Sequence, residues 1–430
     1  MVVVLLLVRE GASLTLHHGD CLAVLPTLEA ESIDAIVTDP PYGLGFMGKA
    51  WDHGVPGVAF WAEMLRVAKP GAHLLAFGGT RTVHRIATAI EDAGWEIRDT
   101  LVWAYASGFP KSLDVSKAID KAAGAERPVL APNPNHRAPA TDHHERWNGA
   151  VLNPNVTAPA TDLAREWQGW GTALKPAWEP IVMARKPLRG TVAGNVTEYG
   201  TGALNIDGCR IGTEGGGGNG LGSSFGGPTV PRVVHGEDRT GTLGRWPANV
   251  ILTDPIFDGD TPGVVGGGAQ ATQANRADPA SKKMGDPGVL PWQTGRAVEY
   301  LGDAGTYSRF FLVPKAARSD REPVIASLPM RTPPGWSSGE QSPGTFQSQP
   351  TPARQNVHPT VKPTELMRHL VRLVTPPGGT VLDPFLGSGT TALACEAEGF
   401  EWVGIEREAE YVAIAEARLN GTQRGLGLTG

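Results

Sequence analysis

The sequence has few cysteines, which limits the kinds of site that it can build. Three occur among 430 residues, at Cys21, Cys209 and Cys395. Residues so far apart offer neither a disulfide framework nor the close spacing of a zinc site. Such cysteine usage is typical of a protein in a reducing compartment. We therefore expect a cytoplasmic location and no metal site.

Long apolar runs and an excess of positive charge are also missing. The apolar run Val2–Val8 is too short to span a bilayer. It predicts instead a strand that pairs with Ser13–Leu16, and no membrane partner is expected. The net charge is −6, from 38 Lys and Arg against 44 Asp and Glu. This balance does not favour phosphate binding by the whole surface, although a nucleic-acid-binding protein needs only a basic face.

What the sequence does contain is organised around the stretch Ile33–Gly43. Its apolar first half predicts a short buried strand. That strand must end at Asp39, because Pro40 and Pro41 cannot donate to a ladder. The carboxyl ends of strands carry the chemistry in open α/β sheets. A carboxylate, a rigid piece of backbone and the ring of Tyr42 are therefore predicted at the mouth of a sheet.

A nucleobase amine would make use of this set of groups. An exocyclic amine is a poor nucleophile because its lone pair is delocalised into the ring, and two acceptors on its N–H groups favour the reactive, pyramidal form. Asp39 and the carbonyl of Pro40 could supply these acceptors in a preorganised geometry. Tyr42 offers a face on which a base taken out of its stack can lie. The alternative is a strand that ends in a proline turn capped by Asp39.

The sequence Thr-Asp-Pro-Pro-Tyr-Gly at Thr38–Gly43 resembles the catalytic motif of the amino-group DNA methyltransferases, which methylate adenine N6 or cytosine N4. The resemblance implies that Asp39 and the Pro40 carbonyl hold the amine, that Pro41 completes the motif, and that Tyr42 stacks on the flipped base. No cysteine follows a proline, as the nucleophile of a carbon-5 cytosine methyltransferase would. That chemistry is therefore not expected.

A second motif, Gly379–Thr391, lies near the other end of the chain and is typical of a strand, a Gly-rich turn and the start of a helix. A further strand ends at Glu406, about twenty residues past the glycines, where an acid in nucleotide-binding sheets reaches ribose hydroxyls. The turn is not a phosphate-binding loop, because no Gly-Lys-Ser/Thr follows. The alternative is a tight strand-to-helix turn without a ligand.

This second motif resembles the S-adenosylmethionine motif of the same family. The resemblance implies that Glu406 takes the cofactor ribose. It further implies that Asp20 touches the adenine ring, although Asp20 is equally a candidate helix cap. Lys362, in His-Pro-Thr-Val-Lys-Pro, would meet the carboxylate of the cofactor beside a helix over 364–374. The remaining implied cofactor-binding residues are Asp383, Pro384, Phe385, Gly387, Ser388, Gly389 and Thr390.

Between the motifs, strands and helices alternate. Helices are predicted over 60–68 and 82–93, and strands over 73–77 and 96–103. This alternation predicts a parallel, doubly wound α/β sheet. With the resemblance it indicates a seven-stranded, mostly parallel, Rossmann-like methyltransferase sheet with an irregular Gly/Pro-rich insert.

The order of the motifs, catalytic first and cofactor last, resembles the β class of these enzymes. We expect the catalytic half at 1–125, an insert and target-recognition region with some core strands at 126–350, and the cofactor-binding half at 351–430. Within the middle region, the cations of Arg185–Arg189 either meet DNA phosphates or form a solvated strand end.

The resemblance therefore predicts an S-adenosylmethionine-dependent methyltransferase acting on adenine N6 in double-stranded DNA, with the target base flipped out. Adenine is favoured because the motif begins with Asp39, whereas Ser there often marks cytosine-N4 enzymes. The alternatives are a cytosine-N4 enzyme, an RNA or protein-amide methyltransferase, and a non-catalytic DNA-binding relative. Intact Asp39 and Tyr42 argue against the last. The recognition sequence, a restriction-enzyme partner and a homodimer stay open.

Overall fold

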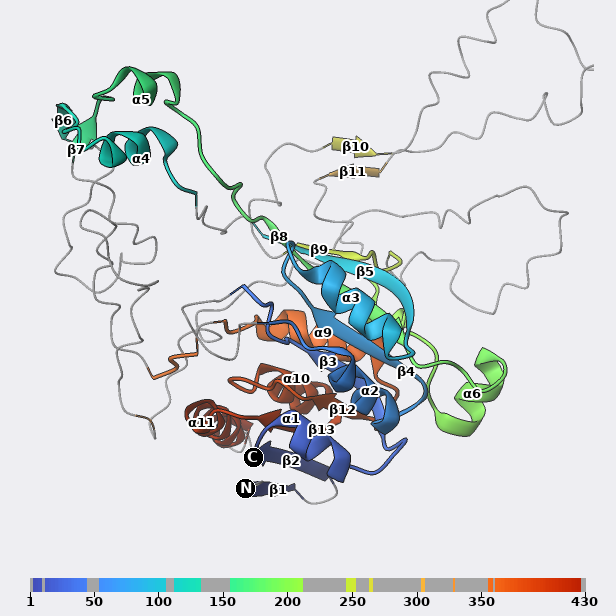
Figure 1. The fold of residues 1–430 in the computed structure, drawn as a ribbon. Coiled ribbons are helices and arrows are strands. Elements are labelled where there is room, and N and C mark those ends of the chain that lie inside the picture. Colours follow the sequence, from blue (N-terminus) through green and yellow to red (C-terminus); the bar gives the residue numbers. More distant parts are fainter. Residues whose placement is uncertain are drawn as a thin grey trace, which may run out of the picture.

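A mostly parallel sheet forms the centre of the protein (Figure 1). The structure, a computed structural model, describes residues 3–9, 12–44, 54–105, 112–132, 155–211, 245–252, 263–265, 303–305, 328, 355–358 and 360–426. Within these residues, the sheet has nine strands, in the spatial order β1 (Val3–Arg9), β2 (Ala12–His18), β13 (Glu401–Glu406), β12 (Thr380–Asp383), β3 (Ile33–Thr38), β4 (Ala68–Phe77), β8 (Trp178–Arg185), β5 (Glu96–Ala104) and β9 (Val250–Leu252).

The strand directions confirm the predicted α/β fold class. Strands β2, β13, β12, β3 and β4 run parallel to one another, and β9 is parallel to β5. The sequence predicts seven strands, and nine are described because β1 extends one edge and β9 the other. The predicted pairing of the first two strands is confirmed, since β1 is antiparallel to β2. Strand β8 is antiparallel to both of its neighbours, so it begins at the edge where β4 and β5 end.

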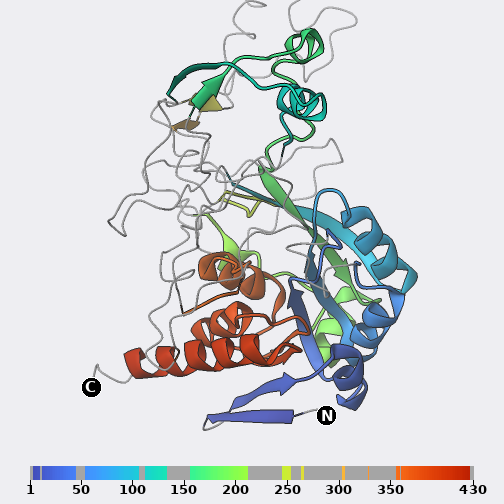
Figure 2. The same cartoon turned by 60° about the vertical axis from the view of Figure 1, so that its left-hand side comes forward.

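Helices cover both faces of this sheet, one set on each side (Figure 2). Side chains alternate along the buried strands, so Val37 and Phe77 pack under one set of helices, while Ile36 and Leu74 pack under the other. All six residues of β3 are buried, as expected for a parallel strand covered on both faces. The two sets are α9 (Thr364–Val374), α10 (Thr390–Glu398) and α11 (Ala409–Leu426), and α1 (Cys21–Val24), α2 (Val58–Val67) and α3 (Val83–Asp92).

The predicted elements of the first hundred residues occur within a few residues of their expected bounds. The helices expected over 60–68 and 82–93 are α2 and α3, and the strand expected over 96–103 is β5. Strand β4 begins at Ala68, five residues before the expected start at His73, because the chain turns directly from α2 into the sheet. The helix expected over 364–374 is α9, with the same bounds.

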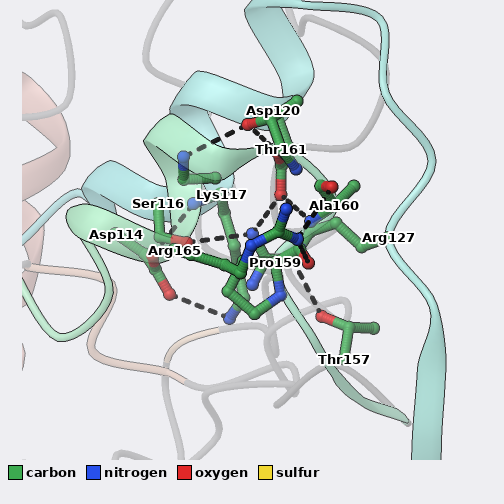
Figure 3. Close-up of polar contacts among 11 residues, drawn as sticks. Asp114, Ser116, Lys117, Asp120, Arg127, Thr157, Pro159, Ala160, Thr161 and Arg165 are labelled. Carbon is green, nitrogen blue, oxygen red and sulfur yellow. Dashed lines mark hydrogen bonds and ion pairs between the residues drawn. The ribbon is translucent and has the colours of Figure 1, made fainter.

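A small unit stands away from the sheet in Figure 1. Its centre is the carboxylate of Asp120, which is fully buried. This carboxylate accepts hydrogen bonds from the guanidinium of Arg127, from the backbone N–H groups of Ala160 and Thr161, and from the hydroxyl of Thr161 (Figure 3). The elements of this satellite unit are α4 (Val115–Ala122), β6 (Val129–Pro132), β7 (Asn155–Thr157) and α5 (Asp162–Glu166).

The cations predicted either to meet DNA or to end a strand each contact another part of the protein. Arg185 contacts Glu96 at 2.7 Å, at the end of β8 opposite the catalytic motif. Lys186 donates to the carbonyl of Ala68 at 2.9 Å, and Arg189 contacts Glu31 at 2.6 Å. These contacts place the three charges at a strand end, and their contact with DNA phosphates stays a prediction.

The remaining described elements are short and come mainly from the middle of the chain. Strands β8 and β9 show that this region contributes to the main sheet, while its expected boundaries near 125 and 350 stay a prediction. All three cysteines are buried free thiols. No helix in the described ranges is long and apolar enough to cross a membrane. The short elements not yet named are η1 (Leu25–Thr27), α6 (Val192–Tyr199), η5 (Asp207–Cys209), β10 (Gly263–Val265) and β11 (Asp303–Gly305).

Candidate active site

Four acidic residues follow neighbouring strands at one edge of the sheet. Asp39 comes directly after β3, Asp383 is the last residue of β12, Glu406 is the last of β13, and Asp20 lies just beyond β2. The strand order β2-β13-β12-β3 places them side by side. The carboxyl edge of a parallel sheet is where ligands of open α/β proteins bind. Both sequence motifs therefore contribute to one site, although they lie at opposite ends of the chain.

The catalytic motif forms a turn whose acid already has two donors. Pro40 is buried, and Asp39, Pro41 and Tyr42 are half-buried. Asp39 accepts a hydrogen bond from the Tyr42 hydroxyl at Oδ1 (2.8 Å) and one from the Lys362 ammonium at Oδ2 (2.5 Å). Burial and the neighbouring carboxylates raise the pKa of Tyr42 well above its usual value. The Tyr42 hydroxyl therefore keeps its proton at neutral pH and acts as a donor.

Lys362 places its ammonium inside this centre. Besides its contact with Asp39, the ammonium lies 3.6 Å from Glu179 Oε2. Burial lowers the pKa of Lys362, but Asp39 and Glu179 raise it further, so the net shift is upward and the group stays charged. The predicted contact of Lys362 with a cofactor carboxylate stays a prediction. The ammonium also lies over three aromatic rings, 4.9, 5.6 and 5.9 Å from the centroids of Phe77, Tyr42 and Trp103.

Glu179 is a member of the site that sequence reasoning missed. It lies at the start of β8, paired in register with Trp103 of β5. Its Oε2 is 2.9 Å from the Tyr42 hydroxyl, and its Oε1 is 3.3 Å from the hydroxyl of Tyr105. No sequence signal reveals this role, because an acid ahead of an apolar strand reaches the site only if that strand runs antiparallel to its neighbours.

Both oxygens of the Asp383 carboxylate accept hydrogen bonds from the protein. Its Oδ1 accepts from the Thr38 hydroxyl (2.7 Å) and the Phe385 N–H (3.1 Å), and its Oδ2 accepts from the Thr391 hydroxyl (2.5 Å). Burial raises the pKa of Asp383 to about 6, although these donors act in the opposite direction. By accepting from the Phe385 N–H, Asp383 fixes the start of the Gly-rich turn, where Pro384 is buried. A direct contact of Asp383 with the cofactor stays a prediction.

The two glycines of the turn are required by its backbone and by its neighbours. Gly387 and Gly389 have φ values of +55° and +83°, which other residues rarely adopt. A Cβ on Gly387 would lie 2.7 Å from Nε2 of His358, and one on Gly389 would lie 3.0 Å from Cβ of Ala415 in α11. The turn therefore packs closely under the His358 segment and α11.

Glu406 and Asp20 both hold backbone at this edge. Glu406 is buried and accepts from the N–H groups of Gly387 (2.8 Å) and Glu408 (2.7 Å), and burial raises its pKa. Asp20 is exposed and accepts from the Leu22 N–H at 2.9 Å, so its capping role is present. The predicted contacts of the two acids with the cofactor ribose and adenine stay predictions.

Arg418 is the second functional candidate that the sequence did not reveal. It is buried in α11, where its Nη1 donates to the carbonyl of Ser388 (2.6 Å), the hydroxyl of Ser388 (3.0 Å) and the hydroxyl of Thr390 (3.0 Å). The last helix of the chain thereby orders the Gly-rich turn. In the described parts of the chain, no group of His, Cys, Asp or Glu is arranged to hold a metal ion.

The parallel sheet with a Gly-rich turn and an acid-Pro-Pro-Tyr turn at one edge defines the class of Rossmann-like α/β proteins. The chain belongs to the N6/N4 DNA methylase family, whose model matches residues 33–189 and 268–417. Two curated relatives are type II methyltransferases: M.XycI of Xanthomonas campestris pv. cyanopsidis, 50% identical over 64 residues, and M.Cfr9I of Citrobacter freundii, 42% identical over 88 residues. These matches cover 15% and 19% of this chain, and 21% and 29% of the relatives.

Two solved structures also resemble the chain at low sequence identity. M1.HpyAVI in complex with SAM is 16% identical, with a TM-score of 0.36 over 94% of this chain and 98% of that chain. The cytosine-N4-specific PvuII DNA methyltransferase is 14% identical, with a TM-score of 0.39 over 94% of this chain and 85% of that chain. The strand order and helix layers described above, rather than these superpositions, define the fold.

Proposed function

We propose that the chain is a site-specific DNA methyltransferase that transfers the methyl group of S-adenosylmethionine to N6 of adenine in double-stranded DNA. Family membership supports DNA methylation as the activity. The observation that carries the proposal is the junction of the two motifs, in which Thr38, next to Asp39, donates its hydroxyl to Asp383 of the Gly-rich turn. A base-binding turn and a cofactor turn are thereby held together.

The residues at this edge fit S-adenosylmethionine. The positive φ values of Gly387 and Gly389 give the turn a backbone that a ligand can approach closely. Glu406 accepts one N–H at each oxygen, so both oxygens keep a lone pair for a ribose hydroxyl. The Lys362 ammonium, set among carboxylates and aromatic rings, shows that the centre suits a positive charge. Bound there, the cofactor would supply a methyl group on a cationic sulfur, which needs no further activation.

The chain's own residues then have to bind and orient the base amine. Asp39 accepts one N–H of the amine and the Pro40 carbonyl accepts the other, which favours a reactive lone pair. The ring of Tyr42 stacks on the flipped base. Asp39 is also placed to receive the proton that the amine loses as its nitrogen gains the methyl group. Catalysis of this kind rests on positioning and electrostatics, without a covalent enzyme intermediate.

Adenine is preferred over cytosine because of the acid at position 39. Among β-class relatives, Ser in place of this residue often marks cytosine-N4 enzymes, whereas this chain has Asp39. Cytosine N4 is the second candidate, since its amine would meet the same acceptors. The similarity to two type II methyltransferases favours a role in restriction and modification.

The test is to incubate purified protein with unmethylated genomic DNA and labelled S-adenosylmethionine, digest the DNA to nucleosides and analyse them by mass spectrometry. Labelled N6-methyladenine is the expected product. N4-methylcytosine would retain the fold and site but reverse the choice of base. No modified base, with cofactor bound, would contradict the proposal and favour an RNA substrate or a non-catalytic relative. The Asp39→Ala protein serves as the control.

A further inference from the structure

The acid that should hold the substrate amine already has one donor at each oxygen in the structure. Asp39 Oδ1 receives the Tyr42 hydroxyl and Oδ2 receives the Lys362 ammonium. Each oxygen could accept a second donor, but an N–H of the base would hold Asp39 most strongly at an oxygen that it does not share with Tyr42 or Lys362. A buried or half-buried donor that loses its acceptor without replacement costs about 1–3 kcal/mol. A second acceptor within reach of the Tyr42 hydroxyl would free Oδ1 without this cost.

Glu179 is in place to be that acceptor. Its Oε2 lies 2.9 Å from the Tyr42 hydroxyl, while Asp39 Oδ1 lies 2.8 Å from the same oxygen. A tyrosine hydroxyl has one proton, and an ionised carboxylate only accepts. Tyr42 can therefore donate to one of the two acids at a time, although the structure holds both at hydrogen-bond distance.

We propose that Glu179 is a positioning residue that takes the Tyr42 hydroxyl from Asp39, so that Asp39 Oδ1 becomes available to the N–H of the target base. This inference rests on the proposed function and assigns a new residue to the same site. The exchange requires only rotation of the hydroxyl proton about the C–O bond. The Tyr42 ring keeps its place for stacking.

Glu179 is held in this position from three directions. The register of β8 against β5 fixes its backbone opposite Trp103. The hydroxyl of Tyr105 lies 3.3 Å from Oε1, whereas Tyr42 contacts Oε2. The ammonium of Lys362 is 3.6 Å from Oε2 and attracts the carboxylate into the centre. With 22% of its side chain exposed, Glu179 is well enough shielded for its charge to matter.

Charge explains why a carboxylate is needed here. A charged acceptor holds a hydrogen bond about twice as strongly as a neutral one. Glu179→Gln keeps the shape and one acceptor oxygen but removes the charge, so Tyr42 would stay on the Asp39 carboxylate. We expect the single-turnover rate of methyl transfer to fall about 10- to 100-fold, the effect of weakening one hydrogen bond to a charged group. The dissociation constants for cofactor and DNA should stay within about twofold.

The matched control is Glu96→Gln, which removes a carboxylate from the other end of the same strand pair, where it contacts Arg185. This variant should transfer methyl groups at the wild-type rate. A double-mutant cycle with Tyr42→Phe then separates positioning from general damage. If Glu179 acts through the Tyr42 hydroxyl, adding Glu179→Gln to Tyr42→Phe should change the rate by less than about threefold. The inference would be overturned if the fold-reduction in rate of the double variant equalled the product of the reductions in the two single variants. A wild-type rate for Glu179→Gln would also overturn it.

A failure of the proposed function is recognised separately. A wild-type protein that methylates no base would refute that function but would leave the Tyr42–Glu179 contact testable. The same four proteins (wild type, both single variants and the double variant) are then unfolded in urea. A coupling free energy clearly different from zero supports the shared hydrogen bond. A coupling of zero overturns it whatever the activity.

Discussion

The hydroxyl of Thr38 donates a 2.7 Å hydrogen bond to Oδ1 of Asp383, across 345 residues of sequence. Thr38 is the last residue of β3 and Asp383 the last of β12, and these two strands are neighbours in the sheet. Both side chains are buried. This contact, beside the pairing of the two strands, couples the turn that begins at Asp39 to the Gly-rich turn.

Thr38→Val should loosen that coupling. Valine keeps the shape of threonine but removes the donor to a buried carboxylate, so we expect the free energy of unfolding in urea to fall by about 1.5–3 kcal/mol. Affinity for S-adenosylmethionine should fall with it. Thr88→Val is the control, because that hydroxyl donates to the His84 carbonyl on an exposed helix surface. Equal losses in the two variants would show that the Thr38 contact has no special weight.

Asp383→Asn should change how stability depends on pH. Burial raises the pKa of Asp383 to about 6, from 3.8 in the unfolded chain. Between these values the native state binds the proton more tightly than the unfolded state, so the contribution of Asp383 falls as pH rises, by up to about 3 kcal/mol. Asparagine keeps the shape without this titration. The unfolding free energy of the variant minus that of wild type should therefore rise between pH 4 and pH 7, and a constant difference would refute the raised pKa.

Local sequence signals were sufficient for the two turns. Pro40 and Pro41 end a strand whatever surrounds it, and Gly387 and Gly389 supply the positive φ values that the second turn requires. The general rule that parallel strands present their carboxyl ends at one edge then brings Asp39 to the same edge as the Gly-rich turn. Both the fold class and the meeting of the motifs could be predicted on these grounds.

Glu179 and Arg418 could not be found in the same way. Glu179 reaches Tyr42 because β8 runs antiparallel to β4 and β5, and periodicity does not reveal strand direction. Arg418 is one of two arginines on α11, and only packing shows that it turns inward onto Ser388. Roles that depend on tertiary contacts between distant segments leave no local pattern.

Gly387→Ala and Gly378→Ala form a pair that separates backbone strain from crowding. Both glycines have positive φ, +55° and +71°, so each substitution costs about 1–2 kcal/mol in backbone strain. A Cβ at Gly378 meets nothing within 4 Å, whereas one at Gly387 meets His358, whose ring packs 4.5 Å from that of Tyr411. Calorimetric titration should show cofactor affinity reduced about tenfold or more in Gly387→Ala alone. Similar affinities in both variants would exclude the close packing seen here.

Asp39→Ala should abolish methyl transfer while leaving cofactor binding nearly intact. The substitution removes the acceptor that we propose for the base amine, and loss of one preorganised group of this kind reduces kcat by about 10²-fold or more. Lys362 keeps Glu179 as a partner, so the ammonium is not left without a counter-charge. Transfer is measured with labelled cofactor, and cofactor affinity by calorimetric titration. Turnover at the wild-type rate would overturn the assignment of the site.

Asp120→Asn should unfold the satellite unit and spare the sheet. Burial disfavours the charged carboxylate of Asp120, but hydrogen bonds from Ala160 and Thr161 and the charge of Arg127 outweigh burial and lower its pKa to about 2. The carboxylate therefore stabilises this unit above pH 4, and its contribution is lost as pH falls towards 2. Hydrogen exchange at pH 7 should show protection lost over α4 and α5 in Asp120→Asn but kept in β3. Asp162→Asn, at a side chain that is 98% exposed on α5, should leave protection unchanged in both places. Protection of α4 and α5 at wild-type levels in Asp120→Asn would mean that packing, rather than this buried carboxylate, holds the unit together.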